Sequence, residues 1–304
     1  MVVEDLNKLY SNCNLCPRHC GANRFNGALG VCQMGSEVTI NLSMLHYGEE
    51  PPITGTKGSG AIFFEGCSLR CIFCQNYQIS RGVTNKGTTL TPDELSNLFL
   101  DLQAKGAHNI NLVTPMHFAP TVAMALEQVH GKSLTIPVVV NTGGYEEVST
   151  LKLLDGLVDV YLPDLKYFDS KIAGECSHAP DYYEKAIAAI DEMYRQVGTP
   201  VFDENGIMRK GVIIRHLMLP GKLFDTKKIL DGIHSHFGDN VYISLMNQYT
   251  PMPTLPESAP AYLHKTINPG HYDSAINYLA VLEHENAFIQ ESDASGDEMI
   301  PKFK

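Results

Sequence analysis

Short apolar stretches alternate with amphipathic stretches along most of the chain, and this alternation constrains the fold more than any other feature. Buried strands are predicted at 61–64, 110–113, 136–140, 157–162, 212–217 and 241–245. Helices are predicted after them at about 91–106, 121–129, 146–154, 181–197, 225–237 and 271–282. Six strand–helix units in strict order predict an α/β fold whose parallel strands are joined by right-handed crossovers. Either an open doubly wound sheet or an incomplete eight-stranded barrel fits, and both bind ligands at the carboxyl ends of the strands.

Charge and hydropathy exclude several classes of function. The 304 residues carry a formal net charge of −11, which disfavours binding to nucleic acid or to an anionic membrane surface, because both depend on Lys and Arg. The first ten residues include Glu4 and Asp5 and do not resemble a signal peptide, and no apolar run reaches about 18 residues. We therefore expect a cytoplasmic protein, in which clustered cysteines bind metals more often than they form disulfides.

Three of the eight cysteines follow the first predicted strand. Cys67, Cys71 and Cys74 are separated by three and two residues, and they lie on the expected ligand face. Three thiolates are one fewer than a four-iron cluster needs for saturation, so one iron stays open for a substrate or cofactor. A zinc site with a distant fourth ligand and three unrelated thiols are the alternatives, but zinc sites usually take cysteines as two separate pairs. The spacing favours a [4Fe–4S] cluster.

This motif, with the aromatic Phe73 before its last cysteine, resembles the radical S-adenosylmethionine (radical SAM) superfamily. Within it, the chain resembles the activating enzymes of glycyl-radical enzymes, such as pyruvate formate-lyase activating enzyme, and their uncharacterised homologues. The supporting segments span most of the chain: 13–24, 62–80, 109–115, 139–146, 158–167, 211–220 and 244–251. The resemblance implies a partial (β/α)6 TIM-like barrel. It also implies S-adenosylmethionine on the open iron, reductive cleavage to a 5′-deoxyadenosyl radical, and abstraction of a hydrogen atom.

The resemblance also assigns residues to the binding of S-adenosylmethionine. Asp164 and Lys166 match an Asp-x-Lys that contacts it after the fourth strand, although an ordinary surface charge pair is the alternative. Arg215, within an apolar run after the fifth strand, suits a carboxylate. The other matched positions are Phe73 near the adenine, Asn141 and Thr142 after the third strand, and Gln248, where several activases carry a histidine.

One segment departs from the activases. Where they have Gly-Gly-Glu after the second strand to hold the amino group of the cofactor, this chain reads Val113-Thr114-Pro115-Met116-His117. Thr114 and main-chain carbonyls are the replacements that the sequence offers. His117 is a candidate hydrogen-bond donor near the site, although a lone histidine is more often structural.

Four further cysteines near the start form a separate group. Cys13, Cys16, Cys20 and Cys32 supply four thiolates, enough to close a site that holds zinc or a second iron–sulfur cluster. Apolar residues are few there, so metal binding is expected to supply the folding energy. Cys176 stands alone and is expected to be a buried bystander. The predicted division is a Cys-rich segment at 1–45, a barrel at 46–282 and a polar acidic tail at 283–304.

These patterns predict an oxidoreductase that activates a glycyl-radical enzyme by removing a hydrogen atom from a glycine Cα. The partners would be that protein and an electron donor such as flavodoxin or ferredoxin. The departure from Gly-Gly-Glu keeps open a radical SAM enzyme that acts on a small molecule or another peptide. A non-catalytic metal-binding scaffold is the third hypothesis.

Overall fold

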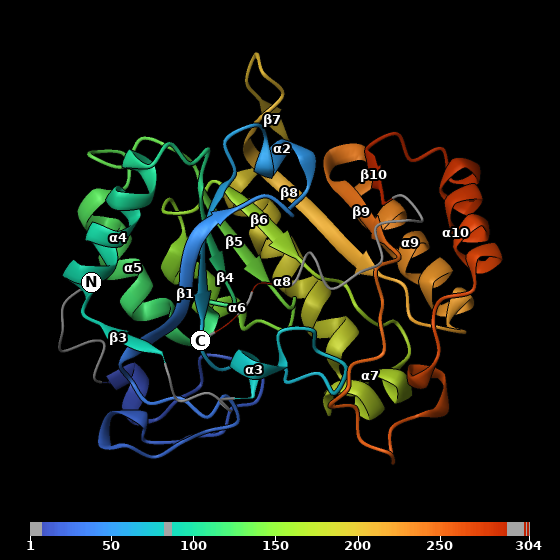
Figure 1. Ribbon diagram of the computed structural model, residues 1–304, viewed down its shortest axis with the longest axis horizontal. Helices are drawn as coiled ribbons and strands as arrows, with labels where there is room; N and C mark the ends of the chain where they lie inside the picture. Colours follow the sequence, from blue (N-terminus) through green and yellow to red (C-terminus); the bar gives the residue numbers. More distant parts are fainter. Residues whose placement is uncertain (1–7, 82–86, 291–300, 302, 304) are drawn as a thin grey trace.

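A sheet of ten strands forms the centre of the computed structural model, which describes residues 8–81, 87–290, 301 and 303 (Figure 1). Its strand order is β10-β9-β8-β6-β5-β4-β2-β1-β3, and β7 pairs with β8 at one side. The central strands are β2 (Ser59–Phe64), β4 (Ile110–Val113), β5 (Val138–Thr142), β6 (Val160–Pro163), β8 (Met208–Leu217) and β9 (Tyr242–Met246). The edges are β10 (Ala287–Ile289), β1 (Val38–His46) and β3 (Thr88–Leu90), and β7 is Val201–Phe202.

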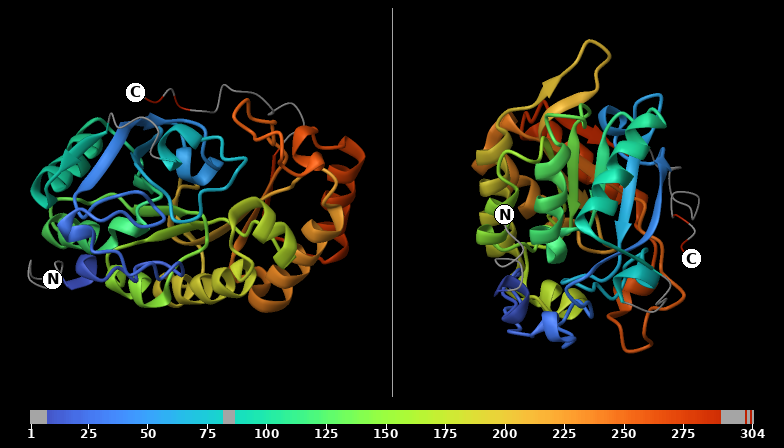
Figure 2. Two further views of the ribbon diagram at one scale, coloured as in Figure 1. Left: turned by 90° about the horizontal axis from the view of Figure 1, so that it is seen from below. Right: turned by 90° about the vertical axis from the view of Figure 1, so that its left-hand side faces the viewer.

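The six central strands are the six predicted from the sequence. Adjacent strands within this group of six are parallel. Every residue of β2, β4, β5 and β6 is buried, as expected when helices cover a parallel sheet. β10 extends the parallel order at one edge, whereas β1 and β3 add antiparallel strands at the other. Within the described residues the two edges do not pair, so the sheet is an open barrel with helices along its outside (Figure 2).

The predicted helices also form. They are α4 (Pro92–Ala104), α5 (Ala119–Val129), α6 (Val148–Leu151) with the 3-10 turn η3 (Lys152–Leu154), α8 (Tyr182–Val197), α9 (Leu223–Phe237) and α10 (Pro269–Val281). At the start of α4, the Thr91 hydroxyl accepts from the Glu94 amide and the Glu94 carboxylate accepts from the Thr91 amide, a capping box that fixes the first turn. The sequence analysis did not predict α2 (Pro51–Thr54), α3 (Tyr77–Ser80) or α7 (Ser170–Ser177).

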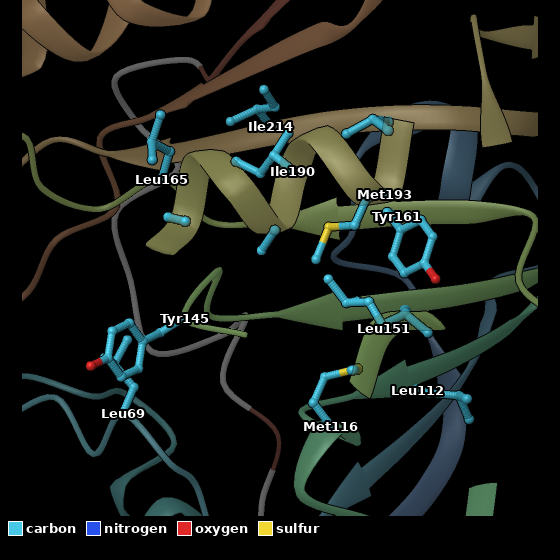
Figure 3. Packing of buried hydrophobic residues seen from close by; sticks show 14 of the residues in the cluster. Leu69, Leu112, Met116, Tyr145, Leu151, Tyr161, Leu165, Ile190, Met193 and Ile214 are labelled. Atoms are coloured by element: carbon cyan, nitrogen blue, oxygen red, sulfur yellow. The ribbon is translucent and has the colours of Figure 1, made fainter. Parts of the chain in front are cut away.

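Helix α8 shows how the outer layer seals the sheet. Ile190 and Met193 are fully buried on its inner face, and they lie beside Tyr161 of β6 and Ile214 of β8 (Figure 3). This packing removes large apolar side chains from water, which stabilises the folded protein by about 25 cal/mol for each Å² of apolar surface that is buried. It also leaves the carboxyl ends of the strands as the face on which loops gather. No described helix is long and apolar enough to span a membrane.

The structure corrects two predicted boundaries. The division at 45/46 falls inside β1, whose residues 40–46 pair with β2, so the Cys-rich segment ends before Val38. The tail predicted from 283 onward contributes β10, which pairs with β9 from Ala287 to Ile289. β1 alternates apolar and polar residues from Val38 to Met44, a signal that the sequence analysis did not use. β10 has only three residues, too few for a local pattern to reveal it.

Candidate active site at the carboxyl ends of the strands

A cavity of about 230 Å³ opens at the carboxyl ends of the central strands. It is lined by all the residues that the sequence analysis assigned to the cluster or to S-adenosylmethionine. These residues are Cys67, Cys71, Cys74, Phe73, Thr114, Asn141, Thr142, Asp164, Lys166, Arg215 and Gln248. They come from six different strand ends and are up to 181 positions apart in the sequence. The parallel order of the strands is what brings them to one place.

The three-cysteine loop leaves β2 and forms one wall of this cavity. Its ends are pinned by the Gly66 amide, which donates to Ile79 O at 2.9 Å, and by the Ile72 amide, which donates to Cys176 O at 2.9 Å. Gly66 has φ 82°, and a Cβ there would lie 2.3 Å from Met34. The glycine therefore permits both the turn and the close packing.

The thiols of this loop suit an iron–sulfur cluster. Burial, and then the neighbouring Cys71, raises the pKa of Cys67 to about 12, and the same two causes raise the pKa of Cys74. Such thiols give up their protons to a metal rather than to water. No three described His, Cys, Asp or Glu side chains converge as ligands of one ion, whereas the thiolates of a cluster bind different irons and lie farther apart. Three soft donors on one wall fit a [4Fe–4S] cluster with one open iron.

A network of charges faces the cysteine loop. Asp164 forms ion pairs with Lys166, from its own loop, and with Arg215 of β8, whose Nε donates to Asp164 Oδ1 at 3.0 Å. Burial acts to raise the pKa of Asp164, but the two cations outweigh it and hold that pKa below its ordinary value. Burial acts to lower the pKa of Lys166, and Asp164 outweighs it. The network therefore stays ionised although its members are mostly buried.

Glu49 is a member of this network that the sequence analysis missed. It lies between β1 and α2, lines the cavity, and accepts from the Asn111 amide at 2.9 Å and the Asn141 amide at 3.2 Å. Arg215 Nη1 lies 3.4 Å from its other oxygen. In the sequence, Glu49-Glu50 before Pro51-Pro52 indicates the start of a helix. Glu49 reaches the barrel because β1, which is antiparallel to β2, ends beside the first residue of β2.

The segment after β4 contains a strained residue and a structural histidine. Thr114 has φ 60°, which is uncommon for a β-branched residue and typical of a functional loop; its amide donates to Asn141 O at 2.8 Å. His117 does not line the cavity. It is buried and donates from Nε2 to Glu65 O at 2.7 Å, and burial, followed by Arg24, lowers its pKa to about 3. The structural interpretation of His117 therefore fits better than a donor role at the site.

The N-terminal cysteines belong to the Cys-rich segment, which is drawn in dark blue at the bottom of Figure 1. Cys13, Cys16 and Cys32 are buried and Cys20 is exposed, and all four are free thiols. Arg24 Nη1 lies 3.6 Å from Cys13 Sγ. Burial raises the pKa of Cys16 to about 12, with smaller contributions from Glu146, Cys32 and Cys13. Their second metal site stays a prediction, since among the described residues no ready single-ion site is present.

Arg18 connects this Cys-rich segment to the three-cysteine loop. Its guanidinium donates to Ser68 O at 2.9 Å and to Ser177 O at 2.6 Å, and also to the carbonyls of Leu69 and His178. The Tyr145 ring lies 5.1 Å from the guanidinium carbon and beside Leu69 (Figure 3). One side chain from between Cys16 and Cys20 therefore ties the loop to the end of α7.

The chain is similar to several known proteins, among them one protein of related sequence and two solved structures. The chain is 30% identical over 257 residues to "Uncharacterized protein MJ0674" of Methanocaldococcus jannaschii, covering 82% of this chain and 69% of that protein. The crystal structure of methylornithine synthase (PylB) matches 95% of this chain and 71% of its own, with 16% identity and a TM-score of 0.49. Streptococcus suis SuiB matches 75% of this chain and 48% of its own, with 14% identity and a TM-score of 0.46.

The decisive match is to the family model described as the radical SAM superfamily, which covers residues 61–231. That range begins in β2, includes the three-cysteine loop, Asp164, Lys166 and Arg215, and ends in α9. It is more than half of the chain, and it contains most of the residues that line the cavity. The chain belongs to the radical SAM superfamily.

Proposed function

We propose that this radical SAM enzyme removes a hydrogen atom from a glycine Cα of a partner protein and so activates a glycyl-radical enzyme. The observation that carries the proposal is the arrangement of one cavity, in which three thiols face a buried network of two cations and two carboxylates. Thiols hold the cluster, and opposite charges hold a zwitterionic amino acid such as the methionine part of the cofactor.

When bound, the cluster and S-adenosylmethionine supply the reductive cleavage and the hydrogen-abstracting chemistry. The chain supplies binding and orientation. Lys166 and Arg215 suit the carboxylate of the cofactor, and the carboxylate of Glu49 replaces the acidic residue that is missing after β4. Phe73, which is buried beside Tyr249 at a ring distance of 5.9 Å, offers an apolar surface for the adenine and keeps water away from the reacting atoms.

A polypeptide substrate is supported by the open side of the barrel. The two edges of the sheet do not pair within the described residues, which leaves access from the side. Pro301 lines the cavity, and the Phe303 ring lies 5.5 Å from the Phe63 ring of β2. Pro301 and Phe303 therefore fit against the cavity wall, as residues in the loop of a partner protein must.

Transfer of deuterium tests the substrate. The enzyme is reconstituted anaerobically and mixed with S-adenosylmethionine, a reductant and pyruvate formate-lyase labelled with Cα-deuterated glycine. We expect deuterium in the 5′-deoxyadenosine and a glycyl-radical signal in electron paramagnetic resonance. The Cys71→Ala variant is the control and should form no 5′-deoxyadenosine. Turnover of the wild type without transfer of deuterium or a protein radical would contradict the proposal.

A small molecule or another peptide is the second candidate substrate, and the absence of Gly-Gly-Glu after β4 favours it. The cavity, at about 230 Å³, is smaller than the usual ligand site, which has a volume of roughly 300–1,000 Å³. The same assay separates the candidates, because loss of a metabolite coupled to 5′-deoxyadenosine would identify this one. A chain that contains zinc and no iron after anaerobic reconstitution would instead support the scaffold.

The electron donor is proposed to be a flavodoxin or a ferredoxin, because the cluster needs one electron at a time. Each protein is supplied in turn in reduced form, and formation of 5′-deoxyadenosine is measured. A rate with either protein at least equal to that with a chemical reductant is expected. Failure of both would contradict this part of the proposal.

We also propose that Cys13, Cys16, Cys20 and Cys32 hold a second metal centre. Its support is the buried position of three of the four thiols and their mutual electrostatic influence. The triple variant Cys67→Ser/Cys71→Ser/Cys74→Ser isolates this group. Elemental analysis should then give one zinc or about four irons per chain, and metal-free protein would contradict the proposal. Cys176→Ser is the matched control.

A further inference from the structure

The sulfur of Cys71 has two buried hydroxyl groups beside it, one from Ser177 and one from Tyr167. Ser177 Oγ lies 3.1 Å from Cys71 Sγ, and Tyr167 Oη lies 3.7 Å from it. Both side chains are fully buried, so water does not compete for their hydroxyls. Neither residue belongs to the cavity lining or to the charged network described above.

The two hydroxyls form one directed chain. Their oxygens lie 2.7 Å apart, and each hydroxyl has a single proton to donate. Ser177 is the nearer to the sulfur, so its proton goes to Cys71 and the Tyr167 proton goes to Ser177. Successive hydrogen bonds of this kind polarise one another, which strengthens the last one.

The surrounding structure fixes both donors in place. Ser177 is the last residue of α7, and its carbonyl accepts from Arg18. The preceding carbonyl, of Cys176, accepts from the Ile72 amide of the cysteine loop. The Tyr167 ring packs edge to face against Tyr182 at 5.1 Å and Phe73 at 6.4 Å. The donors are therefore held against the loop independently of any bound cluster.

We propose that Ser177, supported by Tyr167, is a positioning residue that sets the reduction potential of the cluster through the Cys71 thiolate. A hydrogen bond to a thiolate ligand stabilises the more negative, reduced cluster more than the oxidised one, and therefore raises the potential. The enzyme would then accept an electron from a weaker donor. This inference rests on the cluster of the proposed function.

The test is a redox titration of the reconstituted cluster without S-adenosylmethionine, followed by electron paramagnetic resonance. For Ser177→Ala, we expect the ratio of reduced to oxidised cluster at a fixed potential to fall about tenfold, which is about 59 mV for one electron. Tyr167→Phe should shift the potential in the same direction by less. Since Tyr167 acts through Ser177, the double variant should shift the potential by less than the sum of the two single shifts.

Ser68→Ala is the matched control, because Ser68 lies in the same loop and its hydroxyl makes no described hydrogen bond to a sulfur. A Ser177→Ala protein with full iron content and the wild-type potential would overturn the inference. If the Ser177→Ala protein does not hold a cluster, the Tyr167→Phe protein is the test. A Tyr167→Phe protein with full iron content and the wild-type potential would then overturn the inference. Wild-type protein that assembles no cluster contradicts the proposed function instead, so the two failures are distinguishable.

Discussion

Arg215 is the residue on which the charges at the site depend. It contacts Asp164, Glu49 and Asn141 at once, and these groups are mostly buried. A buried ion pair contributes little net stability, but removal of one partner leaves the other charge without compensation. The network is therefore better understood as a device for presenting charge to a ligand than as a source of stability.

Replacement of Arg215 should be costly even without a ligand. For Arg215→Met, we expect the free energy of unfolding to fall by about 3–5 kcal/mol, since Glu49 loses its buried cation and Asp164 loses one of its two. Urea denaturation of the metal-free protein measures it. Arg209→Met is the control, because Arg209 pairs with Asp203 at the surface and should change stability by less than about 1 kcal/mol. Equal effects of the two variants would show that the network is not electrostatically coupled.

His216 makes stability depend on pH. Its Nδ1–H donates to Leu165 O at 2.7 Å and its Nε2 accepts from the Thr226 hydroxyl at 2.9 Å, so the folded protein requires the neutral ring. Burial lowers the pKa of His216 to about 4. Between about pH 6.5 and pH 4 the unfolded chain binds a proton that the folded chain does not, and stability falls with decreasing pH by about 1.4 kcal/mol per unit.

The variant His216→Gln should lose this contribution. We expect the wild type to be the more stable at pH 7, and the difference in unfolding free energy to shrink by about 2 kcal/mol at pH 5. Chemical denaturation at the two pH values measures it. A difference that is the same at both values would show that the ring is not held neutral.

At the scale of elements, the three-cysteine loop is held by parts of the chain that lie on either side of it in sequence. Arg18, from the Cys-rich segment, and the carboxyl end of α7 both bind its backbone. The loop thus depends on contacts that its own sequence does not encode. This explains how a short run with Arg70 at φ 51° stays in one conformation.

Loss of Arg18 should loosen the loop. For Arg18→Met, we expect amide hydrogen exchange of residues 67–74 to become about tenfold faster, because four carbonyl contacts are lost while the sheet remains intact. Mass spectrometry of peptides from the metal-free protein measures it, with β5 as the internal reference. Arg209→Met serves again as the control. Unchanged protection of 67–74 would show that α7 alone holds the loop.

Element prediction from the sequence succeeded where local signals were strong. The capping box at Thr91 and the continuous apolar runs of the central strands are such signals, and these elements lie within a few residues of their predicted bounds. Helix α7 was missed because it has eight residues, with Gly174 in its interior. Its stability comes from packing against the loop rather than from helix propensity.

At the scale of the whole molecule, the end of the barrel contributes to the site. β10 pairs with β9, and the Gln290 side chain accepts from the amides of Asn247 and Gln248. Its amide also donates to Gln248 Oε1 at 3.1 Å. Gln290, from the region that the sequence analysis assigned to a polar acidic tail, therefore orients Gln248, which lines the cavity.

Truncation distinguishes the two parts of this region. Removal of residues 287–304 should lower the melting temperature by about 2–4 °C for each kcal/mol lost, since β10 and the Gln290 contacts disappear. Removal of 291–304 alone keeps β10 and the Gln290 contacts but removes the Phe303 contact with Phe63, and should lower the melting temperature by less. Differential scanning calorimetry measures both. Equal melting temperatures for the two shortened chains would show that β10 does not contribute to stability.

The sequence by itself determined the order of the six parallel strands, the end of the sheet at which the site lies and the thiols that face the cavity. These follow from periodicity and residue spacing, which are local properties. Only the tertiary structure brought Glu49 into the charged network, joined Arg18 to the three-cysteine loop and placed the hydroxyls of Ser177 and Tyr167 beside the Cys71 sulfur. Each of these contacts joins residues between 50 and 166 positions apart, except the contact between Tyr167 and Ser177, which are 10 positions apart. The spacing of residues along a chain carries no record of such distances, because they are set by how the strands pair and the helices pack.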